Sequence, residues 1–165
     1  MPETLDEFYA ALKAFQDKDV NGNGKKDEVY TDSTYSMCML TLTASFGLPP
    51  YLGQGVDESG KVYYGFVQPQ TKDLLMYLNK LYKEKLLDPD YFTMNATTFT
   101  EKIAKNVISS FSGFPKHGEY YGGFAKDVQG VNYQPLKPLK SDLVQNPGIC
   151  GTIKTIEQNY KFAIT

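Results

Sequence analysis

The sequence predicts an α/β fold, in which helices and short strands alternate within a single domain. Segments 4–16, 71–85 and 97–106 place apolar residues at three- and four-residue spacing, which is typical of amphipathic helices. Segments 56–69 and 107–113 instead combine β-branched and aromatic residues with turn formers, as strands do. The chain of 165 residues has no repeat, low-complexity tract or linker, so we expect residues 1–165 to form one layered α/β domain.

The first helix has a well-marked start. Thr4 and Glu7 have the spacing of a capping box. The apolar face that follows consists of Leu5, Phe8, Leu12 and Phe15. We expect this helix to end near Gln16, directly before a polar loop. Residues 35–46 form a second apolar segment, which we expect to be a buried helix ending at Gly47.

The middle of the chain predicts a hairpin followed by a long helix. The hairpin has its turn at residues 57–60 and its strand residues Val62, Tyr64 and Phe66 on one face. The helix over 71–85 carries its apolar side at Leu74, Leu78, Leu81 and Tyr82. The segment LLDPDYF ends this helix, because proline cannot continue it.

The last third of the chain contains many glycine and proline residues, which interrupt regular structure. Residues 107–113 are expected to form a short central strand, and residues 118–130 to be helical despite their glycines. Residues 160–165 form a strand-like apolar run. Both ends of the chain look cut, so we expect a piece of a longer protein, with Met1 supplied by cloning and no signal peptide in this segment.

Composition excludes several classes of protein. The hydrophobic fraction is 41% and mean hydropathy is −0.40, and no apolar run approaches the roughly 18 residues of a membrane span. The net charge of −2 argues against nucleic acid as a partner. All 17 basic residues are lysine, so the chain lacks the bidentate guanidinium fork that suits carboxylate ligands. Cys38 and Cys150 are too few for a disulfide scaffold, and whether they pair is left open.

The most informative segment is the acidic loop, residues 17–28, with the sequence DKDVNGNGKKDE. Oxygen-bearing side chains at Asp19, Asn21 and Asn23 match positions one, three and five of an EF-hand loop, and Gly24 matches its sharp turn. The closing carboxylate falls at position ten instead of twelve, so this is not a helix-loop-helix EF-hand. The alternative is a solvated Asn-Gly turn. Oxygen donors without Cys or His favour Ca²⁺ over zinc or copper.

A calcium ion in this loop would be structural. Six protein donors leave little room for a substrate, whereas a catalytic ion needs an open coordination position.

Three segments together resemble a known family: TLDEFYAALKAFQDKDVNGNGKKDE, LLMYLNKLYKEKLLDPDYF and ISSFSG. They are similar to the family 1 extracellular solute-binding proteins of bacterial ABC importers, and most similar to the lipoproteins that bind oligosaccharides. The resemblance runs from Thr4 to about Gly113. Val20 replaces the usual proline, and Lys85 replaces the usual glycine.

The resemblance implies one lobe of a periplasmic-binding-protein-like (type II) fold, in which two α/β lobes of the same polypeptide close around a sugar. It implies an oligosaccharide ligand, membrane permease subunits as partners, and an extracellular location as a membrane-anchored lipoprotein. It also implies structural calcium, held by Asp19, Asn21, Asn23, Lys25 (through its carbonyl), Asp27 and Glu28.

Sugar contacts cannot be transferred from the family, because cleft residues vary with the ligand. In open α/β sheets, ligands bind outside the carboxyl ends of the strands. The loop after 107–113 supplies rings and polar groups suited to a sugar. The candidates are Ser112, Phe114, His117, Tyr120 and Tyr121. The alternative is that Phe114 and Tyr121 are core or ordinary surface residues, and that the lone His117 is an ordinary exposed histidine.

Three classes of function compete. The first is the substrate-binding component of an importer, which performs no chemistry. The second is a calcium-stabilised cell-surface carbohydrate-binding or adhesion module. The third is a hydrolase, but a single histidine, no nucleophile-elbow motif and no pair of metal-binding histidines argue against an enzyme. Asp88 and Asp90 have the composition of a glycosidase pair, yet their position beside Pro89 indicates capping.

Overall fold

A small parallel sheet organises the chain. The computed structural model describes residues 1–32, 42–57, 59–112, 120–125 and 131–147. Strands β1 (Val29–Asp32) and β4 (Ile108–Ser112) pair in parallel, with Tyr30 opposite Ser110. On its other side β1 takes one bridge from Leu87, so β1 lies in the middle. The α/β class predicted from the sequence is confirmed.

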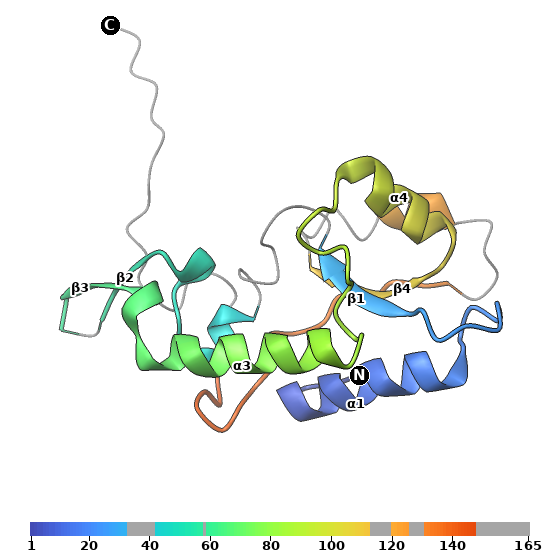
Figure 1. Ribbon diagram of the computed structural model, residues 1–165. Helices are drawn as coiled ribbons and strands as arrows, with labels where there is room; N and C mark the ends of the chain where they lie inside the picture. The colour runs from blue at the N-terminus through green and yellow to red at the C-terminus, as the bar shows by residue number, and fades with distance from the viewer. Residues whose placement is uncertain (33–41, 58, 113–119, 126–130, 148–165) are drawn as a thin grey trace, which may run out of the picture.

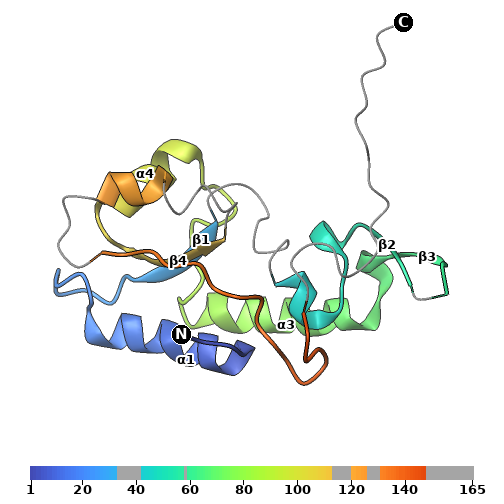
Figure 2. The ribbon, with the colours of Figure 1, turned by 180° about the vertical axis from the view of Figure 1, so that it is seen from behind.

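Helices cover both faces of the sheet. Helix α1 (Leu5–Lys18) lies on one face and α4 (Ala96–Ala104) on the other, as seen in Figure 1 and from behind in Figure 2. Helix α3 (Pro69–Lys83) starts beside the hairpin of β2 (Gln54–Val56) and β3 (Val62–Tyr64), runs toward the sheet and packs beside α1.

Two hydrophobic clusters lie on the opposite faces of the sheet. The larger joins α1, α3 and β1, with Leu12, Leu74 and Leu81 among its fully buried side chains. The smaller joins α4 and β4 around Phe99 and Ile108. Each helix therefore buries its apolar stripe against the sheet or its neighbour, as amphipathic helices do.

Helix α1 starts where it was predicted to start, but near its C-terminal end the buried residue differs from the predicted one. Thr4 accepts a hydrogen bond from the Glu7 amide at 3.1 Å, and the Glu7 carboxylate accepts from the Glu3 amide at 2.7 Å. Phe15, predicted to face the core, is partly exposed, and Gln16 is buried instead. The reason is a non-local hydrogen bond, in which the side-chain amide of Gln16 donates to the Lys85 backbone carbonyl at 3.1 Å.

The segment before the hairpin differs from its prediction where it is described. Residues 43–46 form a 3₁₀ turn in place of an α-helix, and Gly47 ends it with a positive φ of 68°. Residues 35–41 of the predicted helix lie outside the described part of the chain, as do Cys38, Cys150 and the predicted strand 160–165.

The hairpin and α3 are confirmed, except that Phe66, predicted as a strand residue, lies in the 3₁₀ turn Gly65–Val67 after β3. Two of the predicted apolar faces are also more exposed than expected. Val62, Tyr64 and Phe66 are all exposed, and Tyr82 is exposed on α3, where Tyr77 packs against the core in its place. Among the described residues no helix is long and apolar enough to cross a membrane.

Candidate functional site

The acidic loop connects α1 to β1. Asp19 caps the end of α1 in the left-handed region, with φ 46°, and Glu28 directly precedes β1. Gly24 has φ 78°, a conformation that glycine adopts without steric cost, and provides the turn expected at the sixth position of the loop.

The loop is held by its own oxygen-bearing side chains. The Asp19 carboxylate accepts hydrogen bonds from the amides of Asn23 at 3.0 Å and Gly24 at 2.8 Å. The side-chain carbonyl of Asn21 accepts from the Asn23 amide at 3.0 Å, and that of Asn23 accepts from the Lys25 amide at 2.8 Å. These contacts fold the side chains of Asp19, Asn21 and Asn23 back onto the backbone of the loop.

The two closing carboxylates complete the set. Asp27 accepts from the side-chain amides of Asn21 and Asn23 at 3.1 to 3.2 Å. Glu28 is only 3% exposed, and its Oε1 accepts from the Asn21 amide at 3.2 Å. Glu28 Oε2 is buried, and no described residue donates a hydrogen bond to it. An unsatisfied buried carboxylate oxygen is costly, and a bound cation is one means of satisfying it.

The donor set fits a hard cation such as Ca²⁺, which prefers carboxylate, amide and backbone oxygens. The loop brings together Asp19, Asn21, Asn23, Asp27 and Glu28, and it places Lys25 within the same turn. Within the described ranges, no group of three or more His, Cys, Asp or Glu side chains is close enough to hold a metal. The acids alone therefore do not make the site, and the two asparagines would have to contribute.

The carboxyl ends of the parallel strands lie at the opposite end of the sheet from the acidic loop (Figure 1). Of the predicted sugar contacts, Ser112 is buried at the end of β4, where its hydroxyl bonds the Tyr30 hydroxyl at 2.5 Å. Tyr121 is also buried, with its ring 4.6 Å from that of Phe99. Tyr120 is 62% exposed. Phe114 and His117 lie outside the described residues.

Phe124 is a surface ring that was not predicted. It is exposed, and its ring centroid lies 5.4 Å from that of Tyr120. Together Tyr120 and Phe124 form an exposed aromatic pair, which could cover the apolar face of a sugar ring. The sequence signal was available, because the two rings are four residues apart in a segment predicted to be helical.

Asp88 and Asp90 are structural. Asp88 is fully buried, and both of its oxygens accept from Lys102 Nζ at 2.8 Å. Asp90 accepts from the same ammonium group at 2.9 Å. Burial disfavours the Lys102 charge, but hydrogen bonds to the two aspartates outweigh it and raise the pKa of Lys102. Asp88 also accepts from the Asp90 amide, which agrees with the predicted capping role.

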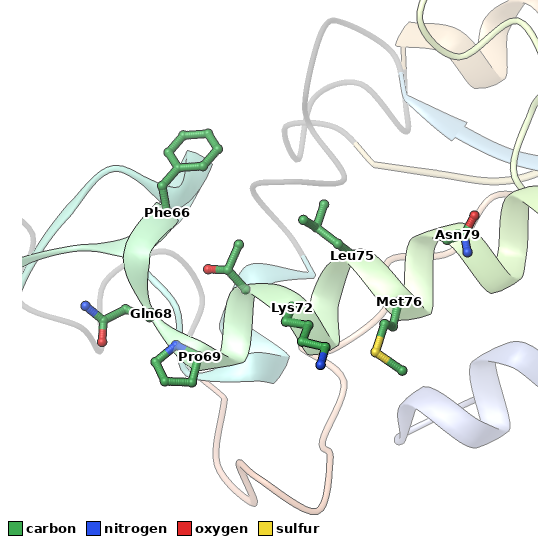
Figure 3. A pocket seen from close by; sticks show the side chains of 8 residues that line it. Phe66, Gln68, Pro69, Lys72, Leu75, Met76 and Asn79 are labelled. Carbon is green, nitrogen blue, oxygen red and sulfur yellow. The ribbon is translucent and has the colours of Figure 1, made fainter.

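A shallow open groove of about 530 Å³ follows the exposed side of α3. Figure 3 shows its side chains projecting from α3 and from the turn before it. The lining residues are Phe66, Gln68, Pro69, Thr71, Lys72, Leu75, Met76 and Asn79. Four of these eight residues are apolar, and Lys72 is the one charged residue among them, so the lining favours apolar contacts over charge recognition.

Comparison with known proteins supports the predicted resemblance. No protein-family model matches the chain. Lipoprotein LipO of Bacillus subtilis is 35% identical over 117 residues, which cover 64% of this chain and 22% of LipO. The fructooligosaccharide ABC transporter substrate-binding protein FusA of Streptococcus pneumoniae is 28% identical over 138 residues, covering 80% of this chain and 24% of FusA. The chain thus spans less than a quarter of either relative.

Solved structures show the same relationship. FusA in complex with kestose matches with a TM-score of 0.59 and 25% identity, over 66% of this chain and 23% of FusA. The alginate-binding protein AlgQ2, in a structure without calcium ion, matches with a TM-score of 0.70 and 25% identity, over 86% of this chain and 29% of AlgQ2. The predicted resemblance to extracellular solute-binding proteins is therefore confirmed, and the described fold corresponds to part of theirs.

Proposed function

We propose that this chain forms one lobe of the substrate-binding component of a bacterial ABC importer, which captures an oligosaccharide outside the cell. The observation that supports this most directly is the match to FusA over 80% of the chain. On this proposal the ligand binds between this lobe and a second lobe of the same polypeptide, and membrane permease subunits receive it. The lipoprotein LipO supports an extracellular, membrane-anchored location.

Capture would require binding without chemistry. The exposed pair Tyr120 and Phe124 supplies a surface on which a sugar ring can stack. The remaining predicted contacts, Phe114 and His117, belong to the same segment of sequence. Buried Tyr121 contacts both rings and would support this surface from below.

The acidic loop would hold a structural calcium ion. Asp19, Asn21, Asn23, Asp27 and Glu28 would supply side-chain oxygens, and Lys25 its carbonyl. The buried Oε2 of Glu28, to which no described residue donates, supports this assignment. The ion would supply positive charge that neutralises the loop's carboxylates and joins the end of α1 to the start of β1.

Calcium should stabilise the fold. A ligand that binds only the folded state adds about 2.7 kcal/mol at a hundredfold excess over Kd, which corresponds to a shift of several degrees in Tm. We expect the Asp19→Ala variant to lose most of this shift. Lys25→Ala is the matched control and should retain it, because only the carbonyl of Lys25 is needed. Melting curves in calcium and in chelator measure the effect, and identical curves for the unchanged protein would disprove the calcium proposal.

A further inference from the structure

The acidic loop contacts a third element besides α1 and β1. The side-chain amide of Asn21 donates to the backbone carbonyl of Asn106 at 3.1 Å, and the two residues are 85 positions apart. Asn106 lies in the turn between α4 and β4 and has a positive φ of 54°, which is unfavourable for most residues but tolerated by asparagine. Asn21 therefore reaches the turn from which β4 starts.

Other hydrogen bonds join the end of the acidic loop to the residues at the start of β4. The Val29 amide, directly after Glu28, donates to the Val107 carbonyl at 2.9 Å, and Val29 pairs with Ile108 in the sheet. The other asparagine of the loop, Asn23, is exposed, and its side-chain amide donates to Asp27 within the loop. The side-chain amides of both asparagines thus donate to Asp27, but only that of Asn21 also donates to the α4–β4 turn among the contacts described.

We propose that Asn21 couples cation binding in the acidic loop to the stability of the α4–β4 turn and strand β4, through its hydrogen bond to the Asn106 carbonyl. The inference rests on the proposed calcium site. The side-chain oxygen of Asn21 would bind the ion, while its side-chain nitrogen donates a hydrogen bond to the Asn106 carbonyl. A bound ion would therefore hold the Asn21 side chain in the orientation that this hydrogen bond requires. Local opening of β4 then breaks a contact of the loaded loop, and calcium opposes that opening.

Two variants separate binding from coupling. Asn21→Asp keeps an oxygen at the same position and adds negative charge for the cation, but it removes the amide group that donates to Asn106. Asn23→Asp makes the same chemical change at the asparagine whose amide stays within the loop. Both variants change a proposed calcium ligand, so calorimetry gives the calcium affinity of each variant, and hydrogen exchange is compared at the same hundredfold excess of calcium over each variant's own Kd.

The measurement is hydrogen exchange of the 165-residue chain in calcium and in chelator. Amides of α3 that exchange only through global unfolding serve as the internal standard, and calcium at a hundredfold excess over Kd should slow them about a hundredfold in every variant, because global unfolding releases the ion. In the unchanged chain and in Asn23→Asp, we expect calcium to slow the exchange of residues 107–112 by nearly the same factor, because local opening of β4 breaks a contact of the loaded loop. In Asn21→Asp, α3 should still be slowed about a hundredfold, whereas residues 107–112 should be slowed much less.

Calorimetric titration with calcium distinguishes the two ways of failing. If the unchanged chain and both variants bind calcium and protect residues 107–112 alike, the coupling through Asn21 is wrong while the calcium site stands. If the unchanged chain binds no calcium, the proposed calcium site and this coupling both fall.

Discussion

At the scale of single residues, the chain depends on polar groups whose partners are distant in sequence. Asp88 is 0% exposed and is neutralised by Lys102, which arrives from α4. Removing one member of a buried ion pair is far more costly than removing the pair, because it leaves an uncompensated buried charge. The ion pair therefore fixes α4 against the segment that follows α3.

Replacing Lys102 with methionine should destabilise the protein by about 3 kcal/mol, because buried Asp88 would lose its cation. Chemical denaturation measures the change in the free energy of unfolding. Lys140→Met is the matched control, since Lys140 pairs with the exposed Glu3, and it should leave stability nearly unchanged. If the two variants lose the same free energy of unfolding, the buried Asp88–Lys102 pair contributes no more to stability than the exposed Glu3–Lys140 pair.

The same variant has a pH signature. The pKa of Lys102 is raised in the folded state, so its contribution is fully present below the unfolded value near 10.5 and is lost as pH rises through the folded value. The difference in stability between the unchanged protein and Lys102→Met should therefore shrink above about pH 10.5. A difference that grows with alkaline pH would contradict this assignment.

At the scale of elements, signals between neighbours in sequence predicted where helices begin and end. Contacts between residues far apart in sequence determined which side chains are buried. The capping box at Thr4 and the stop at Gly47 depend on neighbours in sequence, so they were predictable. The burial of Gln16 in place of Phe15 depends on the Lys85 carbonyl, 69 residues away, which periodicity cannot reveal. The contact of Asn21 with Asn106 could not be predicted for the same reason, because the two residues are 85 positions apart. The calcium ligands of the loop remain a prediction.

The end of α3 offers an element-scale prediction. Lys85 has φ 59°, and the Leu86 amide donates to the Leu81 carbonyl at 2.8 Å, the pattern of a helix end that favours glycine. Lys85→Gly should raise stability by about 0.5 to 1 kcal/mol, because it relieves a left-handed conformation in a residue other than glycine. Lys83→Gly, inside α3, should lower stability by about 1 kcal/mol.

Thermal or chemical unfolding of both glycine variants measures the change in stability. The test is stringent because the two variants are expected to change stability in opposite directions. A loss of stability in Lys85→Gly would mean that the lysine side chain contributes more than its backbone conformation costs.

At the scale of the whole molecule, the chain matches 22% of LipO and 29% of AlgQ2, which is a minor part of each. Its sheet has helices on both faces, while the hairpin, the groove on α3 and the aromatic pair Tyr120 and Phe124 leave apolar surface exposed. In a two-lobed binding protein, closure about a hinge buries the ligand, so each lobe supplies only part of the contacts.

This division of contacts sets the affinity expected of the 165-residue chain by itself. Micromolar binding by an intact two-lobed protein corresponds to about −8.2 kcal/mol, and half of that is roughly millimolar. Calorimetry with kestose, a neutral oligosaccharide, and with an alginate oligosaccharide should therefore show millimolar or weaker binding to this chain.

In the full-length protein, the neutral sugar should bind more tightly than the acidic one, because this lobe has no arginine to form bidentate contacts with uronate carboxylates. A preference for the alginate oligosaccharide would mean that lysines or the second lobe recognise the carboxylates. Micromolar binding of either sugar by this chain alone would instead place the whole site within one lobe, and the two-lobe proposal would be wrong.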